Sequence, residues 1–175
     1  MPELYVGLMS GTSLDGVDAA LVDFDVPPGQ LVAHHFLPYP DDVRAEALAL
    51  CASGPDEIER AAALGVRIAG LYADAVDALL GGLGRPPVIA IGAHGQTVRH
   101  RPERGFTVQV LNPALLAERT GVRVVADLRS RDMAAGGHGA PLVPAYHAAC
   151  FALSDRHRVV ANIGGIANVT DLAPG

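Results

Sequence analysis

A short polar break near the start of the chain combines residue types that bind phosphate with residue types that bind a metal ion. It separates two apolar runs and reads SGTSLDG over residues 10–16. Thr12 and Ser13 offer hydroxyl groups, while Asp15 and Asp18 offer carboxylates. Backbone N–H groups and hydroxyls at a tight turn suit a phosphate, and carboxylates suit an accompanying metal ion. The same residues also fit an ordinary β-hairpin with a polar turn, so the pattern alone leaves both interpretations open.

The charge composition restricts how this chain could hold a phosphate. All 13 basic residues are arginine, and the formal net charge is −6. The absence of lysine excludes a Walker-type phosphate loop, whose lysine reaches the terminal phosphates, and it excludes Schiff-base and PLP chemistry. The acidic balance argues against a nucleic-acid footprint. Phosphate binding would therefore depend on backbone N–H groups, hydroxyls, arginine and metal.

Polar residues also follow a second apolar run, residues 88–92, which is typical of a strand buried on both faces. His94, Gln96 and Thr97 come directly after it. In α/β sheets, ligands bind beyond the carboxyl ends of the strands, so these side chains are candidates for a binding wall. A turn with an internally hydrogen-bonded histidine is the alternative.

A third group of polar residues follows the apolar run at residues 122–126. Arg129 and Arg131 carry planar guanidinium groups that match carboxylate or phosphate, and Asp132 could orient one of them. The alternative is a solvated charged loop whose surface ion pairs stabilise little.

Three further features give weaker signals. His138 lies among glycines, which fits a phosphate cradle, a hinge or a lid. Residues 99–104 form a basic segment, for which a solvated hairpin tip is the default interpretation and a phosphate contact is the alternative. The histidines are scattered, and none pairs with another on one helical face beside an acid, which argues against a zinc site.

The elements that must position these residues follow from hydrophobic periodicity and from turn signals. Strands are expected at residues 4–9, 17–24, 31–37, 88–92, 106–110, 122–126, 158–163 and 166–172. Helices are expected at residues 41–52, 55–80, 113–120 and 142–153, and a long polar loop at 127–141. Three meandering strands followed by strands that alternate with helices predict a mixed α/β sheet, antiparallel on one side and parallel on the other.

Length and composition fit one domain with a real core. The chain has 175 residues, of which 50% are hydrophobic and 18% charged. No apolar run reaches the length of a membrane span, and we expect no signal peptide. Cys51 and Cys150 lie on expected helices and are interpreted as buried free thiols in a reducing compartment, which suggests a cytoplasmic protein.

Four segments, in order, make the sequence recognisable. The first, GLMSGTSLDGVDAALVD, resembles the N-terminal signature of the 1,6-anhydro-N-acetylmuramic acid kinases, which belong to the actin-like ATPase and sugar-kinase superfamily. The other three are AIGAHGQTVRHRP, VVADLRSRDMAAGGHGAPLVPAYH and NIGGIANVT. The resemblance runs from about residue 5 to residue 170.

The resemblance implies a fold and a domain division. The fold would be an actin-like ATPase domain of the ribonuclease H-like kind, spanning residues 1–157. Residues 158–175 would form the first hairpin of an incomplete second domain. Hairpins of both domains contact nucleotide phosphates in this superfamily.

The resemblance also implies the ligands and their contacts. ATP and Mg²⁺ would bind at the first hairpin, with Asp15 or Asp18 assisting the metal. The nucleotide contacts would be Gly11, Thr12, Ser13, Leu14, Asp15, Gly16, Val17 and Asp18, with Gly164 and Gly165 on the opposite side. The sugar, which carries a lactyl carboxylate, would meet His94, Gln96, Arg129, Arg131 and Asp132. Related kinases usually have glutamine where this chain has His138, so no role is assigned to that side chain.

The implied reaction is phosphorylation of the 6-oxygen of the anhydro sugar by ATP, while water opens the 1,6-anhydro ring. The product would be N-acetylmuramic acid 6-phosphate, an intermediate of peptidoglycan recycling. The family's water-activating aspartate lies in an Asp-Thr-Gly-Pro-Gly-Asn segment, which this sequence lacks, so we expect the catalytic residue beyond Gly175. Asp171 does not have that context and is not assigned the role. We therefore expect a fragment or truncated product without kinase activity of its own.

Two other functions remain open. The chain could be a non-catalytic module that binds sugar or nucleotide, or it could be half of a split enzyme that needs a separate C-terminal chain. An unfinished second domain would expose a sheet edge and apolar surface, so we expect self-association through it.

Overall fold

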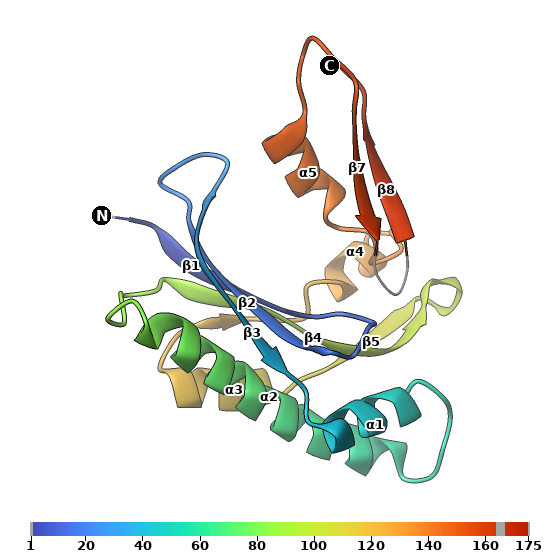
Figure 1. Cartoon of the computed structure of the whole chain (residues 1–175). Coiled ribbons are helices and arrows are strands. Elements are labelled where there is room, and N and C mark those ends of the chain that lie inside the picture. The colour runs from blue at the N-terminus through green and yellow to red at the C-terminus, as the bar shows by residue number, and fades with distance from the viewer. Residues whose placement is uncertain (1, 164–166, 175) are drawn as a thin grey trace.

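A computed structural model describes residues 2–163 and 167–174, and its main body is a six-stranded mixed sheet (Figure 1). The strands are β1 Leu4–Ser10, β2 Gly16–Asp23, β3 Gln30–Pro38, β4 Ala90–Arg101, β5 Phe106–Val110 and β6 Val124–Val125. Their order is β3-β2-β1-β4-β5, with β6 also paired to β4. In β1 every second side chain is buried, because successive side chains of a strand point to opposite faces.

The strand directions confirm a mixed α/β sheet. β1, β2 and β3 pair in antiparallel fashion, whereas β4 runs parallel to both β1 and β6. β5 departs from the simple alternation of parallel strands and helices, since it runs antiparallel to β4. β4 extends to Arg101 and returns through the short 3₁₀ helix η1, Pro102–Arg104. The basic segment, residues 99–104, is therefore the tip of this hairpin, as its default interpretation predicts.

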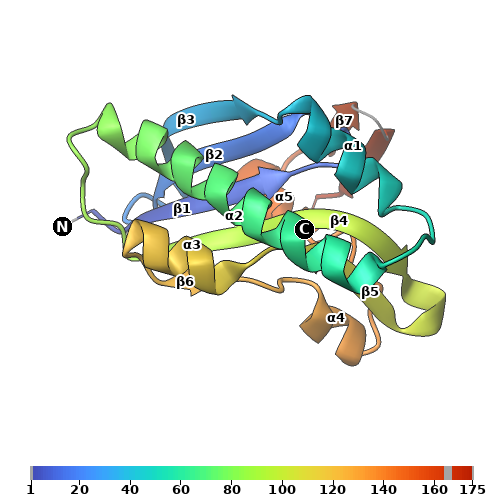
Figure 2. The ribbon, with the colours of Figure 1, turned by 90° about the horizontal axis from the view of Figure 1, so that it is seen from below.

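Helices cover one face of the sheet. α2, Glu57–Gly81, crosses this face, and α1, Asp41–Ala49, and α3, Pro113–Thr120, lie beside it (Figures 1 and 2). The observed ends of α2 differ from the expected range 55–80 by only one or two residues. Its apolar residues recur at three- and four-residue spacing, which places them on the face that contacts the strands.

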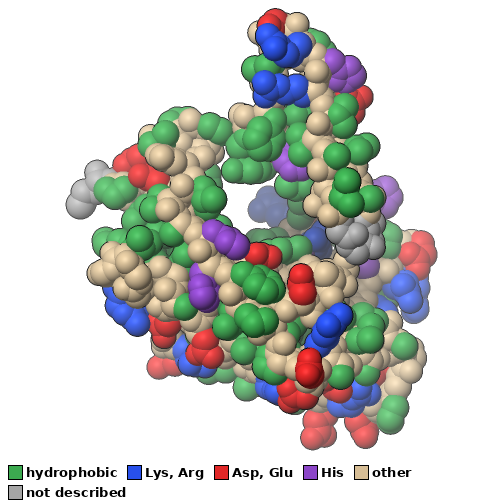
Figure 3. Space-filling view, viewed as in Figure 1, with side chains coloured by type: hydrophobic (Ala, Val, Ile, Leu, Met, Phe, Trp, Pro, Cys, Tyr) green, Lys and Arg blue, Asp and Glu red, His purple; other side chains and the backbone are tan. Residues whose placement is uncertain are grey.

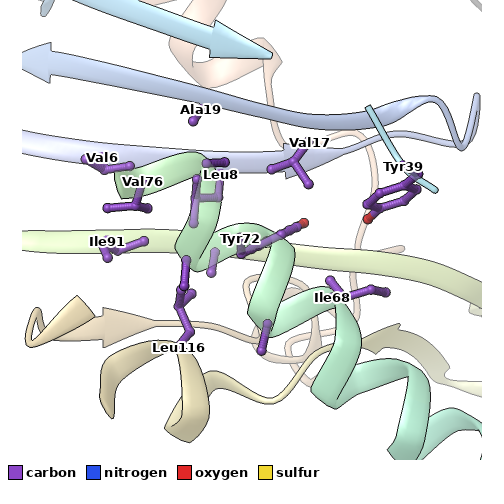
Figure 4. Close-up of a cluster of buried hydrophobic side chains, with 14 of the residues drawn as sticks. Val6, Leu8, Val17, Ala19, Tyr39, Ile68, Tyr72, Val76, Ile91 and Leu116 are labelled. Carbon is purple, nitrogen blue, oxygen red and sulfur yellow. The ribbon is translucent and has the colours of Figure 1, made fainter. Parts of the chain in front are cut away.

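The hydrophobic core lies between α2 and the sheet. Ile68, Tyr72 and Val76 of α2 meet buried strand residues that include Val6 and Ile91 (Figure 4). All five of these side chains are at most 2% exposed. This packing fixes the carboxyl ends of β1 and β4 relative to each other, and those ends carry the candidate site.

The C-terminal part of the chain lies on the other side of the sheet (Figure 1). It contains α4, Ser130–Ala134, α5, Pro144–Phe151, and a separate two-stranded antiparallel sheet of β7, Arg158–Ile163, and β8, Ala167–Leu172. A hairpin at this position was expected.

Three glycines that the sequence-based expectations name fall outside the described residues. Gly164 and Gly165 are the expected phosphate contacts of the second hairpin. Gly175 marks the position beyond which the catalytic aspartate is expected. The contacts of the two hairpin glycines and the location of the catalytic residue therefore stay predictions.

Four local expectations were wrong. The strand expected at residues 88–92 is β4, Ala90–Arg101, so His94, Gln96 and Thr97 lie within the strand instead of after it, and Ile89 is exposed.

The expected loop at residues 127–141 contains α4, because a single helical turn is too short for periodicity to reveal it. β6 has only two residues, and Val125 is exposed instead of buried. Cys51 is exposed just beyond the end of α1, and Cys150 is half-buried, although both are free thiols as expected.

The expectation about membrane spans concerns helices. No helix within residues 2–163 and 167–174 combines the length and the hydrophobicity that crossing a bilayer requires.

Candidate functional site

The turn between β1 and β2, residues 11–15, lies at the carboxyl end of β1. Its backbone closes through one long hydrogen bond, in which the N–H of Leu14 donates to the carbonyl of Gly11 at 3.3 Å. Leu14 has a positive φ of 56°, and its side chain is buried. The carbonyl of Asp15 accepts a hydrogen bond from the N–H of Tyr39 at 2.9 Å. Both ends of the turn are thus fixed, and Leu14 can offer a ligand only its backbone.

The outer side of this turn is open. Among the described residues, the N–H groups of Thr12, Ser13 and Asp15 have no intramolecular acceptor, and all three residues are exposed. The hydroxyl of Ser13 donates to Oδ1 of Asp15 at 2.6 Å, so it would have to turn to donate to a ligand. Unpaired N–H groups on a compact turn form a concave site for an anion.

The inner side of the turn rests on a buried polar network. Ser10 donates through Oγ to the carbonyl of Gly95 at 3.1 Å, and its oxygen lies 2.8 Å from the hydroxyl of Tyr72. Since a serine hydroxyl has one proton, Tyr72 is the donor in that second bond. Burial raises the pKa of Tyr72, which keeps its proton in place. Gln96, with no exposed surface, donates through Nε2 to the carbonyl of Gly11 at 3.1 Å.

The structure places Gln96 beneath the turn instead of along an open wall. Its side-chain amide is also 3.3 Å from the carbonyl of Thr97, and its Oε1 is buried without a protein partner in the described part of the chain. Sequence analysis could not find this role, because burial of this side chain follows from the pairing of β4 with β1 and β5.

The two glycines of this segment have different surroundings. A Cβ on Gly16 would lie 2.3 Å from the carbonyl oxygen of Leu37 and 2.8 Å from the ring of Phe36. A Cβ on Gly11 would have only ordinary contact, 3.5 Å from Oγ of Ser13. The group that approaches Gly16 closely is therefore strand β3, whereas Gly11 leaves space open.

The expected metal-binding carboxylates are both exposed at this end of the sheet. Asp18 accepts a hydrogen bond from Nε2 of His34 at 2.9 Å, and Asp15 accepts from Ser13. Val17 lies between them in the chain, but its side chain is fully buried on the opposite face. Within the described residues, no group of three or more His, Cys, Asp and Glu side chains is arranged to hold a metal ion. A metal ion here would need ligand oxygens from phosphate or water.

A second cluster surrounds His94, at the carboxyl end of the parallel part of β4. Nδ1 of His94 lies 2.6 Å from the carbonyl of Gly95, and Nε2 lies 2.8 Å from Nε of Arg129. Because Arg129 can only donate, Nε2 accepts and the ring carries its proton on Nδ1. Burial lowers the pKa of His94, and the nearby Arg129 cation lowers it further, so the neutral ring is favoured.

The same cluster holds the glycine loop, residues 136–139. Nη1 of Arg129 donates to the carbonyl of Gly139, and the N–H of Gly139 donates to Oδ2 of Asp132 at 2.7 Å. A Cβ on Gly137 would lie 2.2 Å from that carboxylate oxygen, so the loop and Asp132 fit closely together. The structure therefore brings His94, Arg129 and Asp132 together.

Arg131 differs from its neighbours. Its side chain is exposed and makes no hydrogen bond or ion pair within the described residues, whereas Arg129 is half-buried and engaged. His138 is also exposed, and no contact in the structure gives it a role.

A pocket of about 330 Å³ lies beside His94, between β5, the start of α3 and α4. Its polar lining includes Gln109, Asp127 and Ser130, which sequence analysis did not select. Asp127 has a positive φ of 53° and accepts hydrogen bonds from the N–H and hydroxyl of Ser130. The sequence carries no clear helix-start signal for this segment, since α4 begins after Arg129 without a side-chain cap.

The two clusters lie at the same end of the sheet, because β1, β4 and β6 are parallel. The turn follows β1, His94 lies in β4 near the end of its pairing with β1, and Arg129 comes after β6. The space-filling view shows an open hollow between the side of the sheet formed by β1–β3 and the segment of α5, β7 and β8 (Figure 3). Histidine and acidic side chains gather beside this hollow (Figure 3).

Comparison with known proteins gives one consistent result. The family model described as anhydro-N-acetylmuramic acid kinase matches residues 3–175. Proteins of that name from Bordetella petrii, Pseudomonas paraeruginosa and Nitrosospira multiformis are 59%, 57% and 55% identical to this chain. These matches cover 98%, 98% and 96% of this chain and 46%, 47% and 47% of the respective relatives. The chain thus spans about half the length of the curated relatives it matches.

Proposed function

The chain belongs to the anhydro-N-acetylmuramic acid kinase family, and from that premise we propose that it carries the nucleotide-phosphate site of an ATP-dependent sugar kinase. In the proposed reaction, the 6-oxygen of 1,6-anhydro-N-acetylmuramic acid takes the terminal phosphoryl group of ATP. Water adds at C1 as the bond from C1 to O6 breaks. The products are ADP and N-acetylmuramic acid 6-phosphate.

The open turn at residues 11–15 is the observation that supports this function. The N–H groups of Thr12, Ser13 and Asp15, which have no acceptor within residues 2–163 and 167–174, can donate to phosphate oxygens without a lysine. Phosphoryl transfer depends mainly on positioning and on charge neutralisation, and a turn fixed from beneath by Gln96 and Ser10 serves positioning.

The residues at this turn fit Mg²⁺. Exposed carboxylate oxygens of Asp15 and Asp18 are hard ligands, and Mg²⁺ usually takes one or two carboxylates together with substrate phosphates and waters. When bound, the ion would neutralise charge on the β- and γ-phosphates. Asp18 would then exchange its contact with His34 for the metal or for metal-bound water.

On the sugar side, Arg131 is the best candidate for the lactyl carboxylate. Its guanidinium group is exposed and has no contact within the described residues, and its planar donor fork matches a carboxylate. His94, Arg129 and Asp132 are engaged with one another and with the glycine loop, so we assign them to shaping the wall.

We further propose that residues 1–157 form one actin-like domain and that residues 158–175 begin a second. Exposed apolar side chains on β7 and β8, including Ile163 at 86% and Val169 at 69%, support a surface that more polypeptide would cover. The second candidate function, half of a split enzyme, rests on the same surface. We place the reaction in peptidoglycan recycling and in the cytoplasm, where free thiols such as Cys51 persist.

The proposed function can be tested with a fused kinase, defined as residues 1–175 of this chain joined to the remaining C-terminal part of the Bordetella petrii relative. We expect the fused kinase to consume ATP only when the anhydro sugar is present, and to release N-acetylmuramic acid 6-phosphate. The 175-residue chain alone should give no product, because it lacks the Asp-Thr-Gly-Pro-Gly-Asn segment that we expect beyond Gly175.

Turnover by the 175-residue chain alone would refute the assignment of the catalytic base to another part of the enzyme. A folded fused kinase that neither binds Mg·ADP nor phosphorylates the sugar would refute the proposed function itself. Addition of the C-terminal part as a separate chain tests the split enzyme, which predicts that activity returns on mixing.

A further inference from the structure

The two clusters of the site meet at one backbone atom, the carbonyl oxygen of Gly95. Ser10 donates to it through Oγ at 3.1 Å, and His94 donates to it through Nδ1 at 2.6 Å. Gly95 has a positive φ of 75°, and a Cβ there would lie 3.0 Å from the carbonyl oxygen of Val110. Only glycine suits this backbone, and its carbonyl oxygen lies between the two donors.

One arm from this oxygen leads to the phosphate-binding turn. Ser10 is 1% exposed, ends strand β1 and directly precedes the turn. Behind it, the hydroxyl of Tyr72 donates to Oγ of Ser10 at 2.8 Å, which leaves the single serine proton for Gly95. If the turn moved, Ser10 would move with it and its bond to Gly95 would change.

The other arm leads to the glycine loop on the sugar side. His94 donates to Gly95 through Nδ1 and accepts from Arg129 at Nε2. Arg129 in turn donates to the carbonyl of Gly139. Asp132 holds the N–H of the same glycine at 2.7 Å. The loop that shapes the proposed sugar wall is thus joined to the turn without a break in hydrogen bonding.

We propose that this hydrogen-bonded chain, Ser10–Gly95–His94–Arg129–Gly139, couples the two substrate sites, so that nucleotide phosphates at the turn tighten the binding of the acidic sugar. This inference rests on the proposed function. His94 acts in it as a positioning residue. Coupling between sites is reciprocal, so the sugar must tighten nucleotide binding by the same factor.

The test compares variants of the fused kinase that cut the chain with variants that leave it intact. Ser10→Ala removes the donor to Gly95 without changing any N–H group of the turn. Tyr72→Phe removes the neighbouring buried hydroxyl but keeps the bond from Ser10 to Gly95, so it is a matched control for loss of a buried hydrogen bond. Ser53→Ala, in the exposed loop between α1 and α2, controls for the serine change.

Calorimetry of Mg·ADP binding, with and without saturating anhydro sugar, gives the coupling in a complex that cannot react. We expect the sugar to tighten Mg·ADP binding about fivefold or more in the unchanged fused kinase, Tyr72→Phe and Ser53→Ala, and less than about twofold in Ser10→Ala. If Ser10→Ala fails to fold, His94→Gln cuts the chain at the next bond, because glutamine can accept from Arg129 but has no ring nitrogen beside Gly95. The same loss of coupling is expected.

Coupling that is equal in Ser10→Ala and in the unchanged fused kinase would overturn the inference. Independent binding of the two ligands to the unchanged fused kinase would also overturn it and would leave the proposed function intact. Failure of a folded fused kinase to bind either ligand would overturn the proposed function and this inference together.

Discussion

Individual glycines show how closely residue type and backbone are matched at this site. Gly16→Ala would place a methyl group 2.3 Å from the carbonyl oxygen of Leu37, so β3 would have to move. We expect a loss of unfolding free energy of roughly 1–3 kcal/mol, as for other overpacked positions. Chemical denaturation of the 175-residue chain measures this change.

Gly11→Ala is the matched control. Its added methyl group would make only ordinary contact, and we expect a change within roughly 0.5 kcal/mol, as for open surface positions. Equal destabilisation by the two alanine substitutions would contradict the difference in packing between these glycines.

His94 should make stability depend on pH. The pKa of histidine in an unfolded chain is about 6.5, and burial lowers the pKa of His94 in the folded protein. The unfolded chain therefore binds more protons as pH falls. The contribution of His94 to stability should be complete above about pH 6.5, decline below it, and level off once pH is below the folded pKa.

The unfolding free energy of the wild-type chain is compared with that of His94→Gln, because glutamine does not titrate. Arg129 and Asp127 are the charged groups that face His94 from the segment around α4, and both stay in this variant. The stability advantage of the wild-type chain should shrink as pH is lowered. An advantage that grows at low pH would contradict a neutral His94.

Much of the residue-level site follows from sequence, and part of it does not. The turn and the residues His94, Arg129 and Asp132 can be selected from sequence, because polar residues near the ends of apolar runs gather at one edge of a parallel arrangement. Their binding roles stay predictions, and His94 lies within β4 instead of after it. The placement of Gln96 beneath the turn depends on which strands pair with β4, and a single sequence does not specify that pairing.

At the level of elements, α2 should carry a large part of the stability. Ile68 is fully buried between this helix and the sheet, so Ile68→Ala should lower the unfolding free energy by roughly 2–5 kcal/mol. Val66→Ala, on the same helix but 47% exposed, should change it by less than about 1 kcal/mol. Urea denaturation of both variants measures the difference, and similar losses would mean that α2 does not pack as described.

Long periodic elements could be predicted from sequence, whereas short ones could not. α2, β1 and β2 have clear apolar periods over seven or more residues. α4 has five residues and β6 has two, which is too few for any period to appear. The antiparallel direction of β5 depends on the extension of β4 to Arg101, which a basic sequence concealed.

At the level of the whole molecule, the β7–β8 hairpin should cause self-association of the 175-residue chain. Val159 and Val169 are more than half exposed there, and an exposed apolar hairpin is a site for pairing with another chain. Analytical ultracentrifugation should show oligomers that Val169→Asp reduces. Ile58→Asp adds the same charge at a residue of α2 that is 90% exposed and should leave the oligomers unchanged. A monodisperse wild-type monomer would contradict this expectation.

The oxygen shared by Ser10 and His94 belongs to the main chain, and this limits what a mutational scan can reveal. Replacing Gly95 would disturb the backbone itself. Replacing Ser10 or His94 would measure the loss of that side chain and not the contribution of the oxygen. A backbone ester in place of the amide between residues 95 and 96 would weaken this acceptor and leave every side chain intact, and it would also remove the N–H of Gln96, which lies in the β4 ladder. Semisynthesis, rather than codon exchange, is therefore the chemistry that reaches this oxygen without changing a side chain.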